Sequence, residues 1–402
     1  MKDLLQQLDA EEAELIKIRE HLHKNPELSG LEEQTLAFIR DRLSQLDIPF
    51  TEVEKGGIFA SIKNGESDKV ILLRADIDAL PVKEAPNNLV QPKKVVSQVD
   101  GVSHVCGHDA HTAMLLTAAK LIKQHISELD GTVLLCFERA EENGGPDHTY
   151  GVHQLLKYLD KNDIKPDNCL ALHVRPNLDS GKISAEPGGV MAGIFGFEIR
   201  IKGAGGHGSR PDLANNPLDC FTAFYQTLAG LRMRHIDPYN LLTFSIPLVR
   251  MGSQGNVIDE ELYFEGTVRS LDRKSLEQFR DAFLKQLEHF TAAFGCTYQI
   301  EFMYTAMPLH NNADMAKSVR ETVEDLFGTE HYEPCEPSLG SESFAYFTQK
   351  YPGVMAFLGI RNPELGSGAN LHADNFDLDE SVLRYGAGTL AAYALKELKR
   401  KE

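Results

Sequence analysis

The stretch VILLRADIDAL, residues 70–80, is a short apolar run that ends in aspartates. Comparable runs follow in GTVLLCFERAEE (131–142), NCLALHV (168–174) and PGVMAFLGI (352–360), with helical patterns between them. Strands that are apolar throughout are typical of a parallel sheet covered by helices, because both of its faces are buried. The pattern therefore predicts an α/β domain with a mostly parallel sheet.

The order of the elements changes in the middle of the chain. We predict strands over 194–203, 241–252, 261–271 and 296–304, and helices over 216–234 and 273–294. This β-α-β-β-α-β order is that of a ferredoxin-like unit. Helix and apolar strand resume afterwards, so we expect a domain of residues 188–305 inserted into one made of 1–187 and 306–402. A chain of 402 residues also exceeds the usual size of a single core.

Charge and composition exclude several classes of function. The formal net charge of −18 disfavours nucleic acid and anionic lipid as partners, because binding either requires Lys and Arg against phosphates. Residues 1–22 have the pattern of an amphipathic helix, not of a signal peptide, and no apolar stretch is long enough to span a membrane. The 6 cysteines are scattered, which predicts reduced thiols and a cytoplasmic location.

Side chains that bind metals gather at the predicted strand ends. Asp76 and Asp78, then Glu141 and Glu142, then His173 follow successive strands. The carboxyl ends of parallel strands meet at one edge of a sheet, where ligands bind. The segments CGHDAH (106–111) and GSGANLHADNF (366–376) add further donors. Thiolate, imidazole and carboxylate groups suit one or two divalent transition ions. The predicted ligands are Cys106, His108, Glu142, His173 and His372.

A series of segments, in order along the chain, resembles the metallopeptidase family M20. The segments are LHKNPELSGLEEQT, RADIDALPVKE, CGHDAHTAMLL, GTVLLCFERAEENGG, ALHVRP, GAGGHGSRP, GNVID, GTVRS, GSESFAYF and NLHADNFDLDE. The resemblance is to the amidohydrolase branch, which includes N-acyl-amino-acid amidohydrolases, hippurate hydrolases and indole-3-acetyl-amino-acid hydrolases. It implies a zinc-peptidase-like catalytic domain with an inserted lid and dimerisation domain. It also implies hydrolysis of N-acyl amino acids to a carboxylic acid and a free amino acid.

The resemblance also implies roles at the catalytic site. The predicted ligands would hold two divalent ions, Zn²⁺ or Mn²⁺, with Co²⁺ or Ni²⁺ as further candidates. Such ions activate a shared water and polarise the scissile carbonyl. Glu141 would be the general base. His207, in GAGGHG, would reach the partner subunit of a homodimer and stabilise the oxyanion.

Further residues are candidates for supporting roles. Asn256 and Arg269 look like substrate contacts, with Arg269 suited to the α-carboxylate of the product. Arg269 equally fits an ordinary charge on a strand surface. Asp109 and Asp76 are candidates for orienting the ligating imidazoles.

The chain departs from the usual motifs of the branch at a few positions. The branch reads QPAEE and SEDF, and CGHD followed by Gly-His, where this chain has ERAEE, SESF and CGHDAH. The predicted ligands are unaffected. Arg139 and Ser343 stand close to them in sequence, so the preferred acyl group and amino acid stay open.

Rival functions use the same residues differently. A dipeptidase or carboxypeptidase of the same superfamily would cleave another amide with the same metal centre, although the Cys106 ligand favours the amidohydrolase branch. A cysteine hydrolase would use Cys106 and His108, but side chains two positions apart in a loop are poorly placed for that chemistry. A non-catalytic binding protein would have no need of the base Glu141.

Overall fold

The computed structural model describes residues 2–142 and 150–400. The chain divides into a large unit, formed by residues up to 188, 310–336 and from 343 onward, and a small unit, formed by 189–309 and 337–342. The insertion therefore ends later than residue 305, and it recruits a second, short segment. The backbone N–H of Ala192 donates to the carbonyls of Ser338 and Gly340, which attaches this segment to the small unit.

In the described residues of the large unit, seven strands form one sheet in the order β1-β2-β4-β3-β5-β15-β6. Their bounds are β1 Phe50–Val53, β2 Gly57–Asn64, β3 Val70–Asp76, β4 Gly131–Glu138, β5 Asn168–Asp179, β6 Ile183–Ser184 and β15 Gly353–Arg361. The central neighbours β4, β3, β5 and β15 run in parallel, whereas β1, β2 and β6 pair in antiparallel fashion at the edges. The predicted α/β class is confirmed. The sheet is mixed, with parallel strands at its centre and antiparallel strands on both sides.

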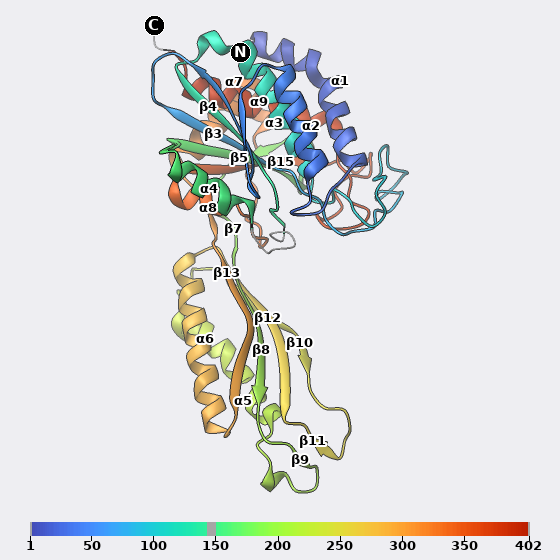
Figure 1. The fold of residues 1–402 in the computed structure, drawn as a ribbon, viewed down its shortest axis with the longest axis vertical. Coiled ribbons are helices and arrows are strands. Elements are labelled where there is room, and N and C mark those ends of the chain that lie inside the picture. Colours follow the sequence, from blue (N-terminus) through green and yellow to red (C-terminus); the bar gives the residue numbers. More distant parts are fainter. Residues whose placement is uncertain (1, 143–149, 401–402) are drawn as a thin grey trace. The chain divides into compact units, whose positions relative to one another are not determined.

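Helices cover this sheet in two groups (Figure 1). The first group is α1 Lys2–Lys24, α2 Glu33–Gln45, α3 His108–Gln124, α7 Ala313–Phe327 and α9 Leu383–Glu397. The second group is α4 Gly151–Lys161 and α8 Ala345–Lys350. α3 is buried along most of its length between α1, α9 and the sheet, as expected for its apolar sequence. Short 3₁₀ turns lie at Ile126–Glu128, Pro211–Leu213, Thr329–His331 and Glu380–Val382.

The small unit has the predicted ferredoxin-like order. Within 189–309, which is described throughout, the main sheet has the order β10-β12-β8-β13. The bounds are β8 Gly193–Lys202, α5 Pro217–His235, β10 Leu242–Arg250, β12 Glu261–Ser270, α6 Arg273–Ala293 and β13 Thr297–Ala306. Two short ladders join β9 (Gly206–His207) to β11 (Val257–Ile258), and β7 (Gly188–Met191) to β14 (Leu309–Asn311). The phenylalanine-rich core lies between the main sheet and its two helices.

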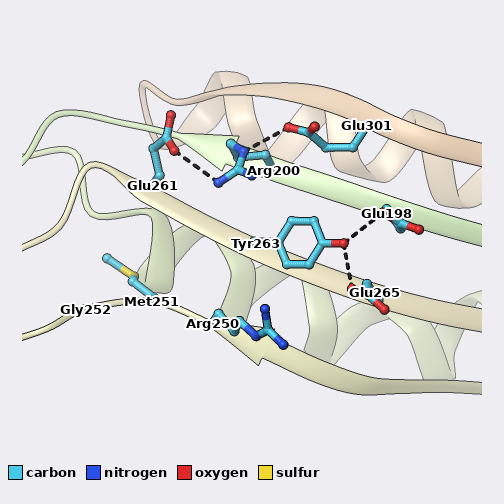
Figure 2. Close-up of a pocket in the computed structure, with 9 residues that line it drawn as sticks. All are labelled: Glu198, Arg200, Arg250, Met251, Gly252, Glu261, Tyr263, Glu265 and Glu301. Carbon is cyan, nitrogen blue, oxygen red and sulfur yellow. Dashed lines mark hydrogen bonds and ion pairs between the residues drawn. The ribbon is translucent and has the colours of Figure 1, made fainter.

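The opposite face of this small sheet is polar and forms an open hollow of about 510 Å³ (Figure 2). Arg200 pairs with Glu261 at 3.1 Å and with Glu301 at 2.9 Å. The Tyr263 hydroxyl lies 2.6 Å from a Glu265 carboxylate oxygen. Arg200 and Tyr263 are therefore engaged by carboxylates of the same face, and Arg250 also lines the hollow.

Among the described residues, no helix combines the length and the apolar composition needed to cross a bilayer. All the cysteines of the sequence fall in the described ranges, and all are free thiols.

Candidate metal centre

The carboxyl ends of β3, β4 and β5 align at one edge of the large unit's sheet. In the parallel pair of β3 and β4, Asp76 lies opposite Glu138; in the pair of β3 and β5, Arg74 lies opposite Ala171. Asp76 lies two residues after Arg74, and His173 lies two residues after Ala171. This register brings their side chains to the place where parallel sheets bind ligands.

The loop before α3 and the first residue of α3 place Cys106 and His108 at the same edge. Between them, Gly107 has a φ of +91°, and a Cβ at this position would lie 2.4 Å from Val174 Cγ2. Only glycine allows the backbone this conformation and this close approach to β5. Cys106 Sγ consequently lies 3.6 Å from His173 Nε2.

The donors expected from the sequence converge on Glu142. His372 Nε2 lies 3.2 Å and His108 Nε2 lies 3.8 Å from Glu142 Oε1. One ligand atom from each of Cys106, His108 and Glu142 fits within a group no wider than 4.8 Å. The structure therefore brings together all of the predicted ligands, from segments far apart in the sequence.

The donor set fits a divalent cation. His108 Nε2 is buried and has no hydrogen-bond partner among the described residues. An unpaired buried polar atom is costly, and here it faces a thiol and a carboxylate. A transition-metal ion is the group whose preferences match sulfur, imidazole nitrogen and carboxylate oxygen together.

Electrostatics also favour a cation over a cysteine nucleophile. Burial, reinforced by the Glu142 carboxylate, raises the pKa of the Cys106 thiol well above its ordinary value. Burial, reinforced by His111, lowers the pKa of His173 well below its ordinary value. A raised pKa keeps a thiol protonated and unreactive. A bound cation would instead favour a thiolate and a neutral imidazole, which are the forms that ligate metals.

His372 is held in a strained backbone conformation. Its φ of 65° lies in the left-handed region, which is uncommon for residues other than glycine. The His372 N–H donates to the carbonyl of Val105 at 2.8 Å, beside Cys106. Strain of this kind persists where the surroundings fix a residue, as they do at many functional sites.

Asp78 orients the His108 imidazole. Asp78 Oδ1 lies 3.0 Å from His108 Nδ1, which fixes Nε2 as the free atom. The other Asp78 oxygen accepts from the backbone N–H of Glu142 at 3.0 Å and from the Ser29 hydroxyl. A single carboxylate thus holds two predicted ligands, and this role had not been predicted for it.

The expected supporting role of Asp109 differs from its observed contacts. Asp109 Oδ2 accepts from Arg19 Nε at 2.8 Å and lies 2.8 Å from His23 Nδ1. Its other oxygen makes no hydrogen bond among the described residues. Asp109 therefore ties α1 to α3, because its side chain leaves the helix toward α1, and it does not orient a ligand imidazole directly.

Asp76 contacts His111, a histidine for which no role was predicted from the sequence. Asp76 Oδ1 lies 2.6 Å from His111 Nδ1, and His111 Nε2 accepts from the Val174 N–H at 2.9 Å. Both ring nitrogens of His111 thus have partners, and ligand atoms of Asp76, His108, His111 and His173 also lie within 4.8 Å of one another, a second group that could hold a cation. The position of His111 three residues after His108 on α3 places the two on one helix face, which is the signal that could have revealed it.

The turn that presents Glu141 and Glu142 is fixed by Glu32. Ala140 has a φ of 54°, and its N–H donates to Glu32 Oε1 at 2.8 Å. Arg139 Nε donates to the other oxygen of Glu32, also at 2.8 Å. The Arg139 side chain therefore faces the segment before α2, and it braces the turn.

Replacing Asp78 with alanine is expected to weaken metal affinity by about 10–100-fold, because residues that orient a ligand imidazole have effects of this size. Metal titration of the purified protein measures the change. Asp109→Ala is the matched control, since Asp109 is equally buried but bonded to Arg19 and His23. Equal losses of affinity in both variants would contradict the specific role of Asp78.

In the small unit, the structure brings together two of the predicted residues. His207 on β9 pairs with Val257 on β11, and the N–H of Gly208 donates to the Asn256 carbonyl at 2.8 Å. Both His207 and Asn256 are exposed. His207 Nδ1 accepts from the Ser209 N–H at 3.1 Å, so Nε2 is the ring nitrogen that this contact does not use.

Arg269 lies at the other end of the small sheet. On β12, Glu261 pairs with Lys202, near the β9–β11 ladder, whereas Arg269 pairs with Ile194. Eight residues of strand at about 3.3 Å each separate these positions by roughly 26 Å. Arg269 is half-buried, and its Nη1 donates to the Leu339 carbonyl at 3.4 Å. His207 and Arg269 of one chain therefore cannot contact the same small substrate.

Curated proteins of similar sequence include several hydrolases. The chain is 33% identical to "Thermostable carboxypeptidase 2" of Saccharolobus solfataricus, over 98% of this chain and 99% of that protein. It is 33% identical to "N-acetylcysteine deacetylase" of Bacillus subtilis, over 95% and 96% of the two chains. It is 31% identical to "IAA-amino acid hydrolase ILR1-like 5" of Arabidopsis thaliana, over 96% and 86%.

Solved structures of similar fold include a putative aminohydrolase from methicillin-resistant Staphylococcus aureus, with a TM-score of 0.88, 28% identity and coverage of 99% and 100%. Another is a dinuclear metal-binding peptidase from Bacillus subtilis, with a TM-score of 0.81, 29% identity and coverage of 97% and 99%. The model of "Peptidase family M20/M25/M40" matches residues 72–396. With this match and the relatives above, the family suggested by the motifs is confirmed: the chain belongs to peptidase family M20/M25/M40.

Proposed function

We propose that this member of the family, an enzyme that acts on amides, hydrolyses the amide bond of N-acyl amino acids. The products are a carboxylic acid and a free amino acid. The observation that carries the proposal is the convergence of the predicted ligands beside a second carboxylate, Glu141. Relatives named as an N-acetylcysteine deacetylase and an IAA-amino acid hydrolase support this substrate class.

The proposed centre takes two divalent ions, Zn²⁺ or Mn²⁺, with Co²⁺ or Ni²⁺ as alternatives. The ligands would be Cys106, His108, Glu142, His173 and His372. When bound, such ions supply Lewis acidity and lower the pKa of water. A similar solved structure is described as dinuclear and metal-binding, which supports the stoichiometry.

Glu141 is the proposed general base. Glu142 lies among the nitrogen donors, whereas Glu141 Oε1 accepts from the backbone N–H of Ser343 at 2.8 Å. The two adjacent carboxylates are thus held by different partners. In the proposed reaction, Glu141 accepts a proton from the attacking water and delivers it to the leaving nitrogen, which general acid–base catalysis requires.

The proposed contribution of the small unit is substrate recognition and dimerisation. Arg269 would grip the α-carboxylate, and His207 with Asn256 would act in the site of a second subunit. The separation of Arg269 from His207 within one chain supports that division of roles. A homodimer through the small unit is supported by the outer strand β13, on which Phe302 and Met303 are exposed, because unpaired strand edges readily join another chain.

We expect a cytoplasmic enzyme with reduced cysteines, and a small N-acyl amino acid as its partner. The net charge of −18 argues against nucleic acid and anionic membrane surfaces.

A carboxypeptidase or dipeptidase is the second candidate function. The observation that favours it is the 33% identity to a protein named as a thermostable carboxypeptidase. Both activities cleave an amide next to a carboxylate-bearing residue, so the metal centre alone does not separate them. A non-catalytic binding protein is disfavoured, because binding would not require Glu141 beside the ligands.

A substrate panel tests the proposal. We expect N-acetyl and larger N-acyl amino acids to be cleaved faster than dipeptides with a free amino group, in buffer supplemented in turn with Mn²⁺, Zn²⁺, Co²⁺ or Ni²⁺. A chelator should abolish the activity, and divalent ions should restore it. Preference for dipeptides would favour the second candidate. Activity that resists chelation but is lost on alkylation of Cys106 would favour a cysteine hydrolase.

A further inference from the structure

A buried ring of hydrogen bonds joins β3, β4 and the segment before α8. Its members are Arg74, Glu138 and Ser343, which are 2%, 0% and 6% exposed. Arg74 Nε donates to Glu138 Oε2 at 2.8 Å, and Arg74 Nη2 donates to Ser343 Oγ at 3.0 Å. The Ser343 hydroxyl donates to Glu138 Oε1 at 2.7 Å, which closes the ring.

The ring depends on a balance of charge. Glu138 Oε1 also accepts from the Val152 N–H at 3.1 Å, and Arg74 lies over the Phe344 ring at 5.9 Å, so this environment is buried and closely packed. In such surroundings an ion pair is tolerated only when its polar atoms are satisfied. Loss of the Glu138 charge would remove a partner of Arg74. A second carboxylate at position 343 would place two like charges within hydrogen-bonding distance.

The ring touches the proposed site at two points. Arg74 Nη1 donates to Asp76 Oδ2 at 2.7 Å, and Asp76 in turn holds His111. On the other side, the backbone N–H of Ser343 donates to Glu141 Oε1 at 2.8 Å. A displacement of Ser343 would therefore be transmitted directly to Glu141.

We propose that Arg74, Glu138 and Ser343 form a unit that positions Glu141. The unit requires one carboxylate beside Arg74, and that carboxylate can be supplied by the residue at position 138 or by the residue at position 343. The role in catalysis rests on the proposed function. The observation that carries it is the direct contact of Glu138 with Ser343, and of both with Arg74, because a carboxylate at either position would face the same guanidinium.

Glu138→Gln, Ser343→Asp and the double variant Glu138→Gln/Ser343→Asp test the proposal. We expect each single change to lower kcat by about 10–100-fold with little change in KM, because a displaced base slows the chemistry without weakening binding. The double variant should recover kcat to within about tenfold of wild type, since coupled sites are strongly non-additive. Melting temperatures of the chelated proteins should follow the same order, with losses of about 5 °C in the single variants.

Two controls keep the test specific. Glu66→Gln makes the same chemical change at an exposed side chain in the turn after β2, and it should behave as wild type. In Glu138→Gln/Ser341→Asp, the new carboxylate stands two residues before position 343, so the defect of Glu138→Gln should persist. These variants separate rescue by the ring from a general effect of added charge.

The outcomes divide clearly. The proposal of a shared carboxylate would be overturned if the fold-loss of kcat in the double variant equalled the product of the fold-losses in the two single variants. Recovery of the melting temperature without recovery of kcat would overturn the positioning role of the unit. If wild type cleaves no N-acyl amino acid, the proposed function fails. In that case the melting temperatures of the chelated variants still support the proposal of a shared carboxylate if the double variant recovers, and overturn it if it does not.

Discussion

Replacing Glu141 with glutamine is expected to lower kcat by about 10²–10⁴-fold, the contribution typical of a general base. Glutamine keeps an oxygen that can accept from the Ser343 N–H, so the position of the side chain should be preserved. It cannot accept the proton of the attacking water. Metal content and melting temperature should therefore match those of wild type, and only turnover should fall.

Glu142→Gln is the matched control for this prediction. Glu142 lies 3.2 Å from His372 Nε2 and 3.8 Å from His108 Nε2, so loss of its charge should also reduce metal content. Metal analysis by atomic emission and steady-state kinetics on the same preparations distinguish the two variants. A near-normal kcat in Glu141→Gln would show that another group is the base. Equal loss of metal in both variants would make Glu141 a ligand.

Replacing His207 with alanine is expected to lower kcat by about 10²–10³-fold, as the loss of one oxyanion donor does. The metal content should be unchanged, because His207 lies in the small unit on β9, and the predicted ligands all lie in the large unit. His207 is exposed within its own chain, and its Nδ1 is engaged by Ser209. If the chain dimerises as proposed, its imidazole Nε2 would be the atom that contacts a substrate held by the other subunit.

Mixing subunits tests whether His207 acts across a dimer. A two-fold dimer has two equivalent sites, so a heterodimer of His207→Ala and Glu141→Gln subunits contains one site with both residues intact. After random exchange, the mixture should regain up to about a quarter of wild-type activity. Ser209→Ala serves as a control that perturbs the His207 ring without removing it. Absence of recovery, with subunit exchange demonstrated by labelled chains, would mean that His207 serves its own subunit or that the chain is a monomer.

Local patterns in the sequence were sufficient for the elements and for the identity of the family. Apolar strands alternate with helices in the large unit, as the α/β pattern predicted. The ferredoxin-like order of the small unit followed from the same periodicities. The edge strand β1 was not predicted, because it is short and mostly exposed and therefore lacks the apolar signal of a central strand. Its neighbour β2 was also not predicted, although most of its residues are buried.

The metal-binding side chains could also be identified from the sequence, because they follow strands that run in parallel. Residues that follow parallel strands reach one edge of the sheet whatever their separation along the chain. This rule brought Glu142 and His173 together in the prediction. It does not specify which neighbouring carboxylate bonds to which imidazole, because that choice depends on side-chain rotamers within a shared space.

The sequence by itself therefore determined the fold class, the family and the donor set, since each is encoded in local periodicity or in a contiguous motif. Only the tertiary structure decided that Asp78 orients His108, that Asp109 turns to Arg19, and that Ser343 meets Glu138. The last contact spans 205 positions of the chain. Such pairings arise from strand register and from the packing of distant segments, and no property of either residue's sequence neighbourhood specifies its partner.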